Sequence, residues 1–477
     1  MISSARIVAA FALVVASGAA QGASLERGLA IDDASSLREL DLREKSPGER
    51  SLSLGSMLGA ASNASSADIF SLPAMKPLRA ALDREFGDYA KRGGSLVVFD
   101  REALYAGDTR FILAGIVNRM DRAYKAPETC GEIRLIYRPV ARYGERANGV
   151  VVSSRLPMTV NVVLYARNPS DASSCADIAR HWLALGEGNA TALTAKGGAL
   201  EFAAPDHIAR IETNIQIAHA SANPNDFDAR ADYLLKVFDY DPASKSFTES
   251  AMENQTDRDR ILADPALAND FRQWLLAPGN FTALDRGVIL IPDKYLAKRA
   301  IVTTPAAASN TDGIFDGTEV VETLAKFASK NAVLQNINSP AGFARRLNDV
   351  TCAGCHQTRA VGGFHFPGID WSGDAPGFVV TPASPHFFGD QPRRRDILTS
   401  FRDGQPPDFS RGFSARPQAR RSDGLQGTTY IDGWGAHCYA GAQTDKSFSS
   451  WTCAGNLACQ MPQGGITPVN AGLCFPQ

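Results

Sequence analysis

The eight cysteines of this chain constrain its fold more than any other feature of the sequence. Two of them, Cys352 and Cys355, directly precede His356. Removing that pair leaves six, an even number that suits disulfide bonding in an oxidising compartment. We expect one bridge between two isolated cysteines and two bridges among the other four, for which the sequence allows three pairings. The isolated cysteines are Cys130 and Cys175, and the other four are Cys438, Cys453, Cys459 and Cys474.

The N-terminal segment, residues 1–23, has the layout of a secretory signal peptide. Arg6 supplies a positive charge, residues 7–17 form a short apolar run, and small residues follow up to Ala23. The apolar run is too short to span a membrane comfortably, and no second run of about 18 apolar residues follows. We therefore predict a mature protein that is periplasmic or secreted and has no membrane span.

The charge balance of the chain bears on the kind of partner it binds. Its 477 residues include 49 Lys and Arg and 51 Asp and Glu, which gives a net charge of −2. This balance does not favour nucleic acid as a partner. The length is sufficient for two or three domains.

Residues 76–335 mix strand-like and helix-like segments without a regular strand–helix repeat. The strand-like runs are rich in Val, Ile, Leu and Tyr, and many alternate with polar residues. Strands outnumber helices, which favours an α+β fold with an antiparallel sheet over a doubly wound fold. The predicted strands are 95–99, 110–117, 132–137, 149–153, 159–166, 208–217 and 232–241, and the predicted helices are 175–185, 258–276 and 317–330.

The rest of the chain divides by composition around this α+β domain, whose role the sequence leaves unknown. Residues 24–75 are rich in Ser, Ala, Gly and charge, which predicts a flexible lead-in. Residues 336–405 contain short helical patterns and are predicted to be a small α-helical segment. Residues 406–430 are rich in Gly, Pro, Arg and Ser and are predicted to be a linker. Residues 431–477 form a short cysteine-rich tail that disulfides must hold together.

Residues 352–356, Cys-Ala-Gly-Cys-His, match the C-x-x-C-H pattern of covalent haem attachment. Two thiols on one turn can reach both vinyl groups of one porphyrin, and the adjacent His then coordinates the iron. The sequence therefore predicts one covalent haem c, attached to Cys352 and Cys355 and ligated by His356 on the proximal side. Three other interpretations are a redox-active cysteine pair, a zinc site and a structural disulfide.

The flanking residues resemble the class I cytochrome c module over about residues 338–403. A helix predicted to begin at Ser339-Pro340 leads into the motif, and Gly362-Gly363, His365 and Pro367 follow it. The resemblance implies that the Pro367 carbonyl accepts a hydrogen bond from the proximal His and fixes its ring orientation. It also implies a closing helix that packs on the first, for which residues 392–401 are the candidate. No such resemblance covers residues 76–335.

The chain lacks the residue that usually provides the second axial ligand of the iron in that module. A Met normally supplies it, but no Met occurs between His356 and Met461, which lies in the tail. His386, in an apolar setting, is the preferred distal candidate. His365 is a weaker candidate because the matching His of the family is structural, and His437 is third. An open sixth position is the remaining alternative.

The second axial ligand also decides between functions. The leading prediction is an exported monohaem c-type cytochrome protein that transfers single electrons. The alternatives are a haem-dependent peroxidase or oxidase acting on a substrate held by the N-terminal domain, and a haem-containing binding or sensory protein. Two strong ligands favour electron transfer, whereas open iron favours peroxide or oxygen chemistry. Whether the redox partner is a protein or a small molecule stays open.

A run of three arginines, Arg393-Arg394-Arg395, adds a last candidate feature. Arginine pairs well with carboxylates, so these residues are candidates for neutralising the haem propionates. The alternative is a solvated basic start of the helix predicted over residues 392–401.

Overall fold

The fold is described from a computed structural model of the chain. The described residues are 26–43, 50–91, 96–98, 100–145, 151–185, 190–220, 230–303, 311–356, 366, 368–369, 371–372, 384–413, 416, 427, 431–433, 436–442, 444–461 and 470–476. The predicted signal peptide, and the predicted site residues His365 and Pro367, lie outside them.

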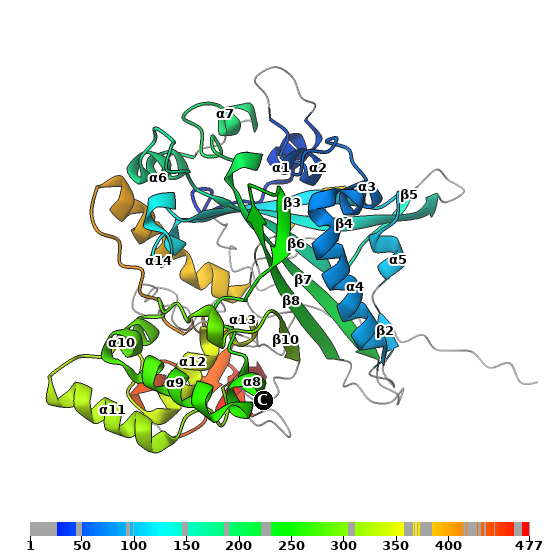
Figure 1. Ribbon diagram of the computed structural model, residues 1–477. Coiled ribbons are helices and arrows are strands. Elements are labelled where there is room, and N and C mark those ends of the chain that lie inside the picture. Colours follow the sequence, from blue (N-terminus) through cyan, green and yellow to red (C-terminus); the bar gives the residue numbers. More distant parts are fainter. Residues whose placement is uncertain are drawn as a thin grey trace, which may run out of the picture.

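A ten-stranded antiparallel sheet forms the centre of the described structure (Figure 1). The strand order along the sheet is β1-β3-β4-β6-β7-β8-β10, with β2 paired to β7, β5 to β4 and β9 to β8. This confirms the predicted α+β class with an antiparallel sheet. The strands are β1 (Ala30–Ile31), β2 (Leu96–Val98), β3 (Arg110–Arg119), β4 (Glu132–Glu145), β5 (Val151–Arg155), β6 (Met158–Tyr165), β7 (Ile208–Ala220), β8 (Arg230–Asp241), β9 (Ser246–Glu249) and β10 (Ala300–Thr303).

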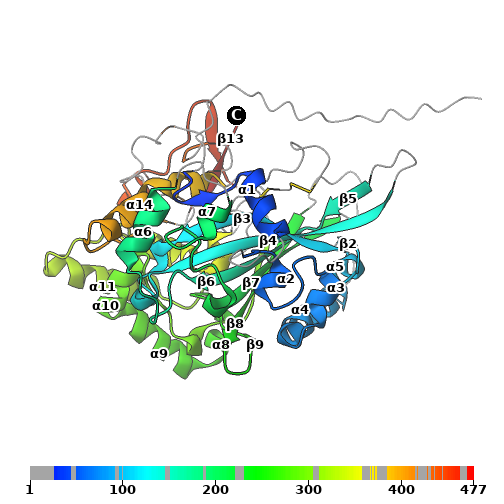
Figure 2. The same cartoon turned by 90° about the horizontal axis from the view of Figure 1, so that it is seen from above.

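The helices fall into three groups around this sheet (Figures 1 and 2). The first group covers the apolar face of the sheet, the second forms a separate helical layer, and the third follows residue 350. The first group is α1 (Ala34–Leu42), α2 (Leu54–Met57), α3 (Ser66–Ser71), α4 (Lys76–Lys91), α5 (Arg101–Leu104), α6 (Cys175–Leu183) and α7 (Ala190–Thr194). The others are α8 (Arg258–Ala263), α9 (Pro265–Leu276), α10 (Pro278–Arg286), α11 (Gly317–Ser329) and α12 (Pro340–Asp349), then α13 (Cys352–Cys355) and α14 (Pro385–Arg402).

The two faces of the sheet differ sharply in polarity, because successive side chains of a strand point to opposite faces. On β4, Ile133, Leu135 and Tyr137 point into the main hydrophobic core, which is shared with α1–α4, α6 and α7. The alternate residues Arg134 and Arg138 of the same strand point to the other face. That polar face is turned toward α13, α14 and the helical layer, so it is enclosed instead of facing water.

The segment predicted to be a flexible lead-in, residues 24–75, differs from that prediction within its described part. Strand β1 pairs with β3, with Ala30 opposite Val117, and several leucines of the segment are fully buried. These leucines are scattered among many Ser and Ala residues, and for this reason the composition alone predicted a flexible segment. The buried leucines are Leu29, Leu37, Leu40, Leu52 and Leu54.

Two predicted helices have different boundaries, and a proline explains each difference. Residues 258–276 form two helices instead of one, because Asp264 ends α8 and caps α9, which begins at Pro265. The helix predicted over residues 392–401 begins earlier, at Pro385, and contains Pro392 in its interior. Its N-cap is Ser384, whose hydroxyl accepts a hydrogen bond from the backbone N–H of Phe387.

Helices α12 and α14 belong to different hydrophobic clusters, unlike the packing that the cytochrome c resemblance implies. Phe343 and Leu347 of α12 are buried with α8–α11 in the helical layer. Phe387 of α14 packs with Val117 and Ile136 of the sheet, and Leu398 joins the main core. Residues 336–405 therefore connect the helical layer to the sheet.

The cysteine-rich tail is held by two disulfides, Cys438–Cys459 and Cys453–Cys474, and the third bridge joins Cys130 to Cys175. This confirms the predicted bridges and settles the pairing in the tail. Three tail strands, β11 (His437–Tyr439), β12 (Leu457–Gln460) and β13 (Ala471–Pro476), form a small antiparallel sheet.

The tail packs on the start of α12. The Ser339 hydroxyl, which caps α12, donates a hydrogen bond to Oδ2 of Asp445 at 2.7 Å. The backbone N–H of Asn338 donates to the Ser447 hydroxyl at 3.0 Å.

The segment predicted to be a linker, 406–430, also contains packed residues, since Phe413 and Arg416 are buried. No helix among the described residues is long and apolar enough to cross a membrane.

Candidate haem-binding site

The C-x-x-C-H motif folds as a single helical turn at the junction between the sheet and the helical layer (Figure 1). Thr351 caps this turn, and its hydroxyl accepts a hydrogen bond from the N–H of Gly354 at 2.8 Å. A side chain at position 354 would place its Cβ 1.9 Å from the carbonyl oxygen of Asn348, so only glycine fits here. The motif is therefore held tightly against the end of α12.

The first cysteine of the motif is anchored to a neighbouring loop. Cys352 Sγ donates a hydrogen bond to the carbonyl of Glu253 at 3.5 Å, and the N–H of Ala353 donates to Oε1 of Gln255 at 2.9 Å. Burial, together with the nearby carboxylates of Glu253 and Glu212, raises the pKa of the Cys352 thiol well above its ordinary value. The thiol is therefore neutral, whereas cysteines that exchange disulfides have lowered pKa values. This environment counts against a redox-active cysteine pair.

A cavity of about 420 Å³ opens next to the motif, and Cys352, Cys355 and His356 all line it. The volume lies within the range of ordinary ligand sites. Part of the wall is apolar and part is strongly charged. The apolar residues are Ile136, Leu235, Val237, Ala251, Met252, Leu290, Ile291, Leu296, Val350, Phe366 and Phe413.

The structure brings the preferred distal candidate, His386, into this same cavity. His386 lies in the first turn of α14, directly after Pro385. Burial, with a smaller contribution from Arg394 and Arg411, lowers the pKa of His386 to about 3, although Asp390 opposes the shift. The imidazole is therefore neutral at physiological pH, which is the form that binds metals.

The other two histidines named as distal candidates are placed differently. His437 is buried in β11 of the tail, 6.3 Å from the ring of Trp451, and is not among the described residues that line the cavity. His365 lies outside the described residues, as does Pro367, the predicted partner of His356.

The cavity wall beside α14 is a network of three arginines and two aspartates, which we call network A. Arg393 binds both aspartates, with Nη2 3.0 Å from Asp121 and Nε 2.7 Å from Asp390. Arg119 binds Asp121 at 2.8 Å, and Arg394 binds Asp390 at 2.7 Å. Burial alone would raise the pKa of both carboxyl groups, but the guanidinium groups outweigh it and hold each pKa below its usual value.

The wall beside Cys352 is a second network, network B, of four cations and three glutamates. Its members are Arg122, Lys125, Arg134 and Arg210 with Glu132, Glu212 and Glu253. Arg134 binds Glu212 at 2.7 Å, and Arg210 binds Glu132 at 2.8 Å. Burial again opposes ionisation, and the surrounding cations still lower the pKa of all three glutamates. Each network thus holds one more cation than carboxylates.

The three arginines that are candidates for binding the propionates have different surroundings in the structure. Arg393 and Arg394 are 2% and 3% exposed, line the cavity and belong to network A, so they are not a solvated helix start. Arg395 is exposed and pairs with Glu26 at 2.9 Å. The run lies in the middle of α14 because that helix begins at Pro385.

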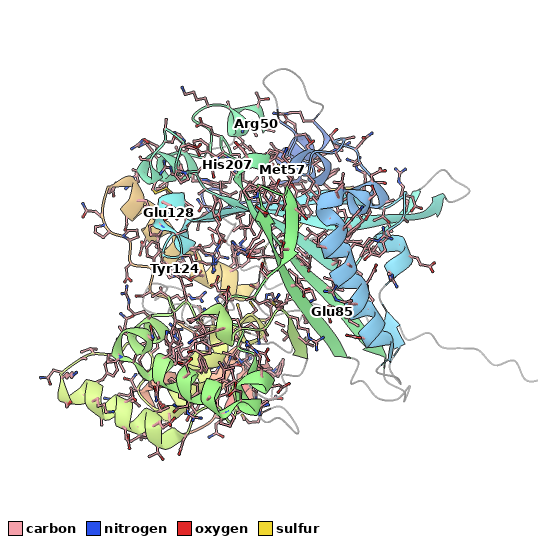
Figure 3. The ribbon with its side chains drawn as sticks, in the orientation of Figure 1. Arg50, Met57, Glu85, Tyr124, Glu128 and His207 are labelled. Atoms are coloured by element: carbon pink, nitrogen blue, oxygen red, sulfur yellow. A yellow bond between two sulfur atoms is a disulfide. The ribbon has the colours of Figure 1, made fainter. Side chains whose placement is uncertain are left out.

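One ion pair joins a residue of the cavity lining to helix α4 on the other side of the sheet. Lys236 of β8 binds Glu85 at 3.0 Å, and Figure 3 labels Glu85 on α4, away from the helical layer. Tyr124, also labelled in Figure 3, lies on the side of α14, with its ring 5.8 Å from that of Phe409. Burial raises the pKa of Tyr124, so its hydroxyl stays protonated.

Sequence reasoning missed network B and most of network A. Apart from the three members on α14, the residues of both networks come from β3, β4, β7 and the segments at residues 121–125 and 253, which lie far from the motif in the chain. Alternating polar residues on an antiparallel strand normally indicate a face in contact with water. The signal available in the sequence was the density of Arg and Glu on that face, as in Glu132, Arg134 and Arg138 of β4.

Comparison with family models, with curated proteins and with solved structures returns no match for this chain.

Proposed function

We propose that this protein is an exported c-type cytochrome protein that binds one haem covalently through Cys352 and Cys355, with His356 as the proximal ligand. The observation that carries the proposal is that these three residues and His386 line one cavity. The motif alone would allow other interpretations, but a neutral, partly buried imidazole facing the same space is what a second axial ligand requires. We propose His386 for that role.

The cavity also fits the periphery of a haem. The aliphatic and aromatic lining outside strands β4 and β8 suits the apolar macrocycle, and the arginines of the two networks suit carboxylates. Networks A and B each hold one surplus cation, and a haem c has two propionates. Arg393 and Arg394 in network A, and Arg122 and Arg134 in network B, are the residues that we propose to hold them.

When bound, haem supplies one-electron redox chemistry. The chain's own residues then set the conditions for it. The buried wall keeps water away from the site, and two imidazole ligands favour a lower potential than the usual His and Met pair. Electron transfer is therefore the function that the site supports best.

A covalent-haem assay on the protein produced with a cytochrome c maturation system tests this proposal. We expect a haem-stained band on a denaturing gel that disappears in the Cys352→Ala/Cys355→Ala variant. We also expect a low-spin visible spectrum that carbon monoxide leaves unchanged. Absence of the stained band from the wild-type protein would refute the proposal. N-terminal sequencing of the mature protein checks whether the predicted signal peptide is removed.

The His386→Ala variant tests the distal ligand separately. It should retain the stained band but become high-spin and bind carbon monoxide, because one side of the iron loses its ligand. His181→Ala, on α6 and outside the cavity lining, serves as the matched control and should behave like wild type. An unchanged spectrum in His386→Ala would exclude His386 as the ligand.

A second candidate function, a haem enzyme that acts on a small substrate, has one observation in its favour. A pure electron carrier needs only an apolar pocket around the macrocycle, whereas this cavity also extends over a polar wall of strands β4, β6 and β7.

A further inference from the structure

The wall that strands β4, β6, β7 and β8 turn toward the cavity is ordered in rows by their pairing. One row contains Ile136, Asn161, Glu212 and Val237, which lie opposite one another on successive strands. The next row contains Thr159, Asn214 and Leu235. All seven of these residues line the cavity. Each asparagine therefore has an aliphatic neighbour on the adjacent strand.

The two asparagines of this wall have unfulfilled hydrogen-bonding capacity. The Oδ1 atoms of Asn161 and Asn214 are buried, and neither has a hydrogen-bond partner within the described part of the chain. Buried polar atoms in native proteins nearly always have partners, so such a pair marks a position where a ligand or water belongs. The two residues are diagonal neighbours across β6 and β7, roughly 7–8 Å apart.

A haem would not satisfy these amides. Its macrocycle offers no donor to a buried oxygen, and its propionates are acceptors that we assign to the arginines of networks A and B. Charge also argues against a second anion at the wall. Of the four further cations that line the cavity, Lys236 pairs with Glu85 and Glu249, and Arg416 pairs with Asp432. The other two, Arg138 and Arg411, are matched in number by Asp239 and Asp293. The ligand that fits the amides is therefore neutral, carries a hydrogen-bond donor and has an apolar body.

We propose that Asn161 and Asn214 form a subsite for a small neutral hydroxylated molecule with an apolar body, of which a phenol is the simplest example. This inference rests on the proposed function, because it makes the molecule the small-molecule partner of the attached haem. The amides accept a hydrogen bond from its hydroxyl, and Ile136, Leu235 and Val237 contact its apolar body.

Calorimetric titration of the haem-loaded, full-length protein with phenol and with anisole tests the subsite. Both probes have the same ring, but anisole has a methyl group in place of the hydroxyl hydrogen. We expect phenol to bind at least about tenfold more tightly, the ratio that one hydrogen bond typically provides. Asn161→Leu and Asn214→Leu should each lose about tenfold in phenol affinity while anisole affinity is retained. Asn269→Leu, at an exposed position of α9, is the matched control and should bind as wild type does.

Each outcome of this experiment is decisive. Equal affinity for the two probes, no binding of phenol, or unchanged phenol affinity in both wall variants would overturn the subsite, and the amides would then bind only water. Retained anisole affinity shows that a variant cavity is intact, so misfolding is recognised. Preferential phenol binding by a protein that carries no covalent haem would refute the proposed function and leave the subsite standing.

Discussion

Asp41 is a buried carboxyl group whose surroundings contrast with those of the carboxylates at the cavity. The five carboxylates of networks A and B are surrounded by guanidinium groups, which keep them ionised despite burial. Asp41 of α1 is completely buried in the main core, and burial raises its pKa to about 7, although Arg110 opposes the shift. Burial thus has opposite consequences for a carboxyl group, depending on the cations around it.

Asp41 should make the stability of the protein depend on pH between about 4 and 8. Its pKa in the folded state lies above the unfolded value of 3.8, so its protonated form stabilises the fold at low pH. That contribution is lost as the pH rises through about 7, which lowers the free energy of unfolding by up to roughly 4 kcal/mol. The Asp41→Asn variant should remove this loss, as measured by urea unfolding at pH 5 and pH 8.

Asp259 provides the matched control for that measurement. Its side chain is 97% exposed, so Asp259→Asn should leave the pH dependence of unfolding as it is in wild type. If Asp41→Asn has the same pH dependence as wild type, Asp41 is not the group responsible.

At the scale of elements, Arg346 ties three segments together next to the cavity. It lies on α12, is fully buried, and donates to the carbonyl groups of Leu284 and Asp285 of α10 at 2.9 and 2.8 Å. It also donates to the carbonyl groups of Arg411 and Gly412, which line the cavity. Burial lowers the pKa of Arg346 to about 10, so it remains a cation at neutral pH.

Replacing Arg346 by Met should cost roughly 3–5 kcal/mol of unfolding free energy, because four carbonyl groups lose their donor in a buried position. Arg395→Met is the matched control on α14, where the side chain is 59% exposed, and should change stability by less than about 1 kcal/mol. Denaturant unfolding of both variants measures the difference. Equal effects of the two substitutions would show that the carbonyl contacts of Arg346 do not stabilise the fold.

Elements with a clear local signal were predictable from the sequence. The alternation of apolar residues located β3, β4, β6, β7 and β8, and Ser339-Pro340 located the start of α12. Ser384-Pro385 carries the same capping signal, but Pro392 also fits the first position of a helix, so the predicted boundary at residue 392 is wrong. Since a strand's polar face looks the same under water as under a covering layer, the alternation of residues could not show that this face is enclosed.

At the scale of the whole molecule, the candidate site is assembled from distant parts of the chain. Its lining residues range from Arg119 on the sheet to Arg416 beyond α14. The tail also packs next to the site. Asp445 and Ser447 bind the residues at the start of α12, and Trp451 lies 5.3 Å from Arg345 of the same helix. The tail therefore supports the helix that leads into the C-x-x-C-H motif.

Removing the tail bridge Cys453–Cys474 by Ser substitution should destabilise the protein by about 2–4 kcal/mol and also loosen α12. Hydrogen exchange of residues 340–349 measures the second effect, which follows from the contacts of Ser339 and Asn338 with the tail. Removal of the Cys130–Cys175 bridge is the control, since it should lower stability without this local increase in exchange. Unchanged protection of α12 in the tail variant would contradict the supporting role of the tail.

Because α12 and α14 pack in different hydrophobic clusters, residues 336–405 cannot be moved to another protein as an independent unit. Cut out alone, residues 336–405 would leave Phe343 and Leu347 without the helical layer and Phe387 without the sheet. A graft of this segment onto another scaffold would therefore carry the cysteines but not the pocket. Transferring the proposed haem site to a new protein would require moving both surfaces that pack on the segment, together with the segment itself.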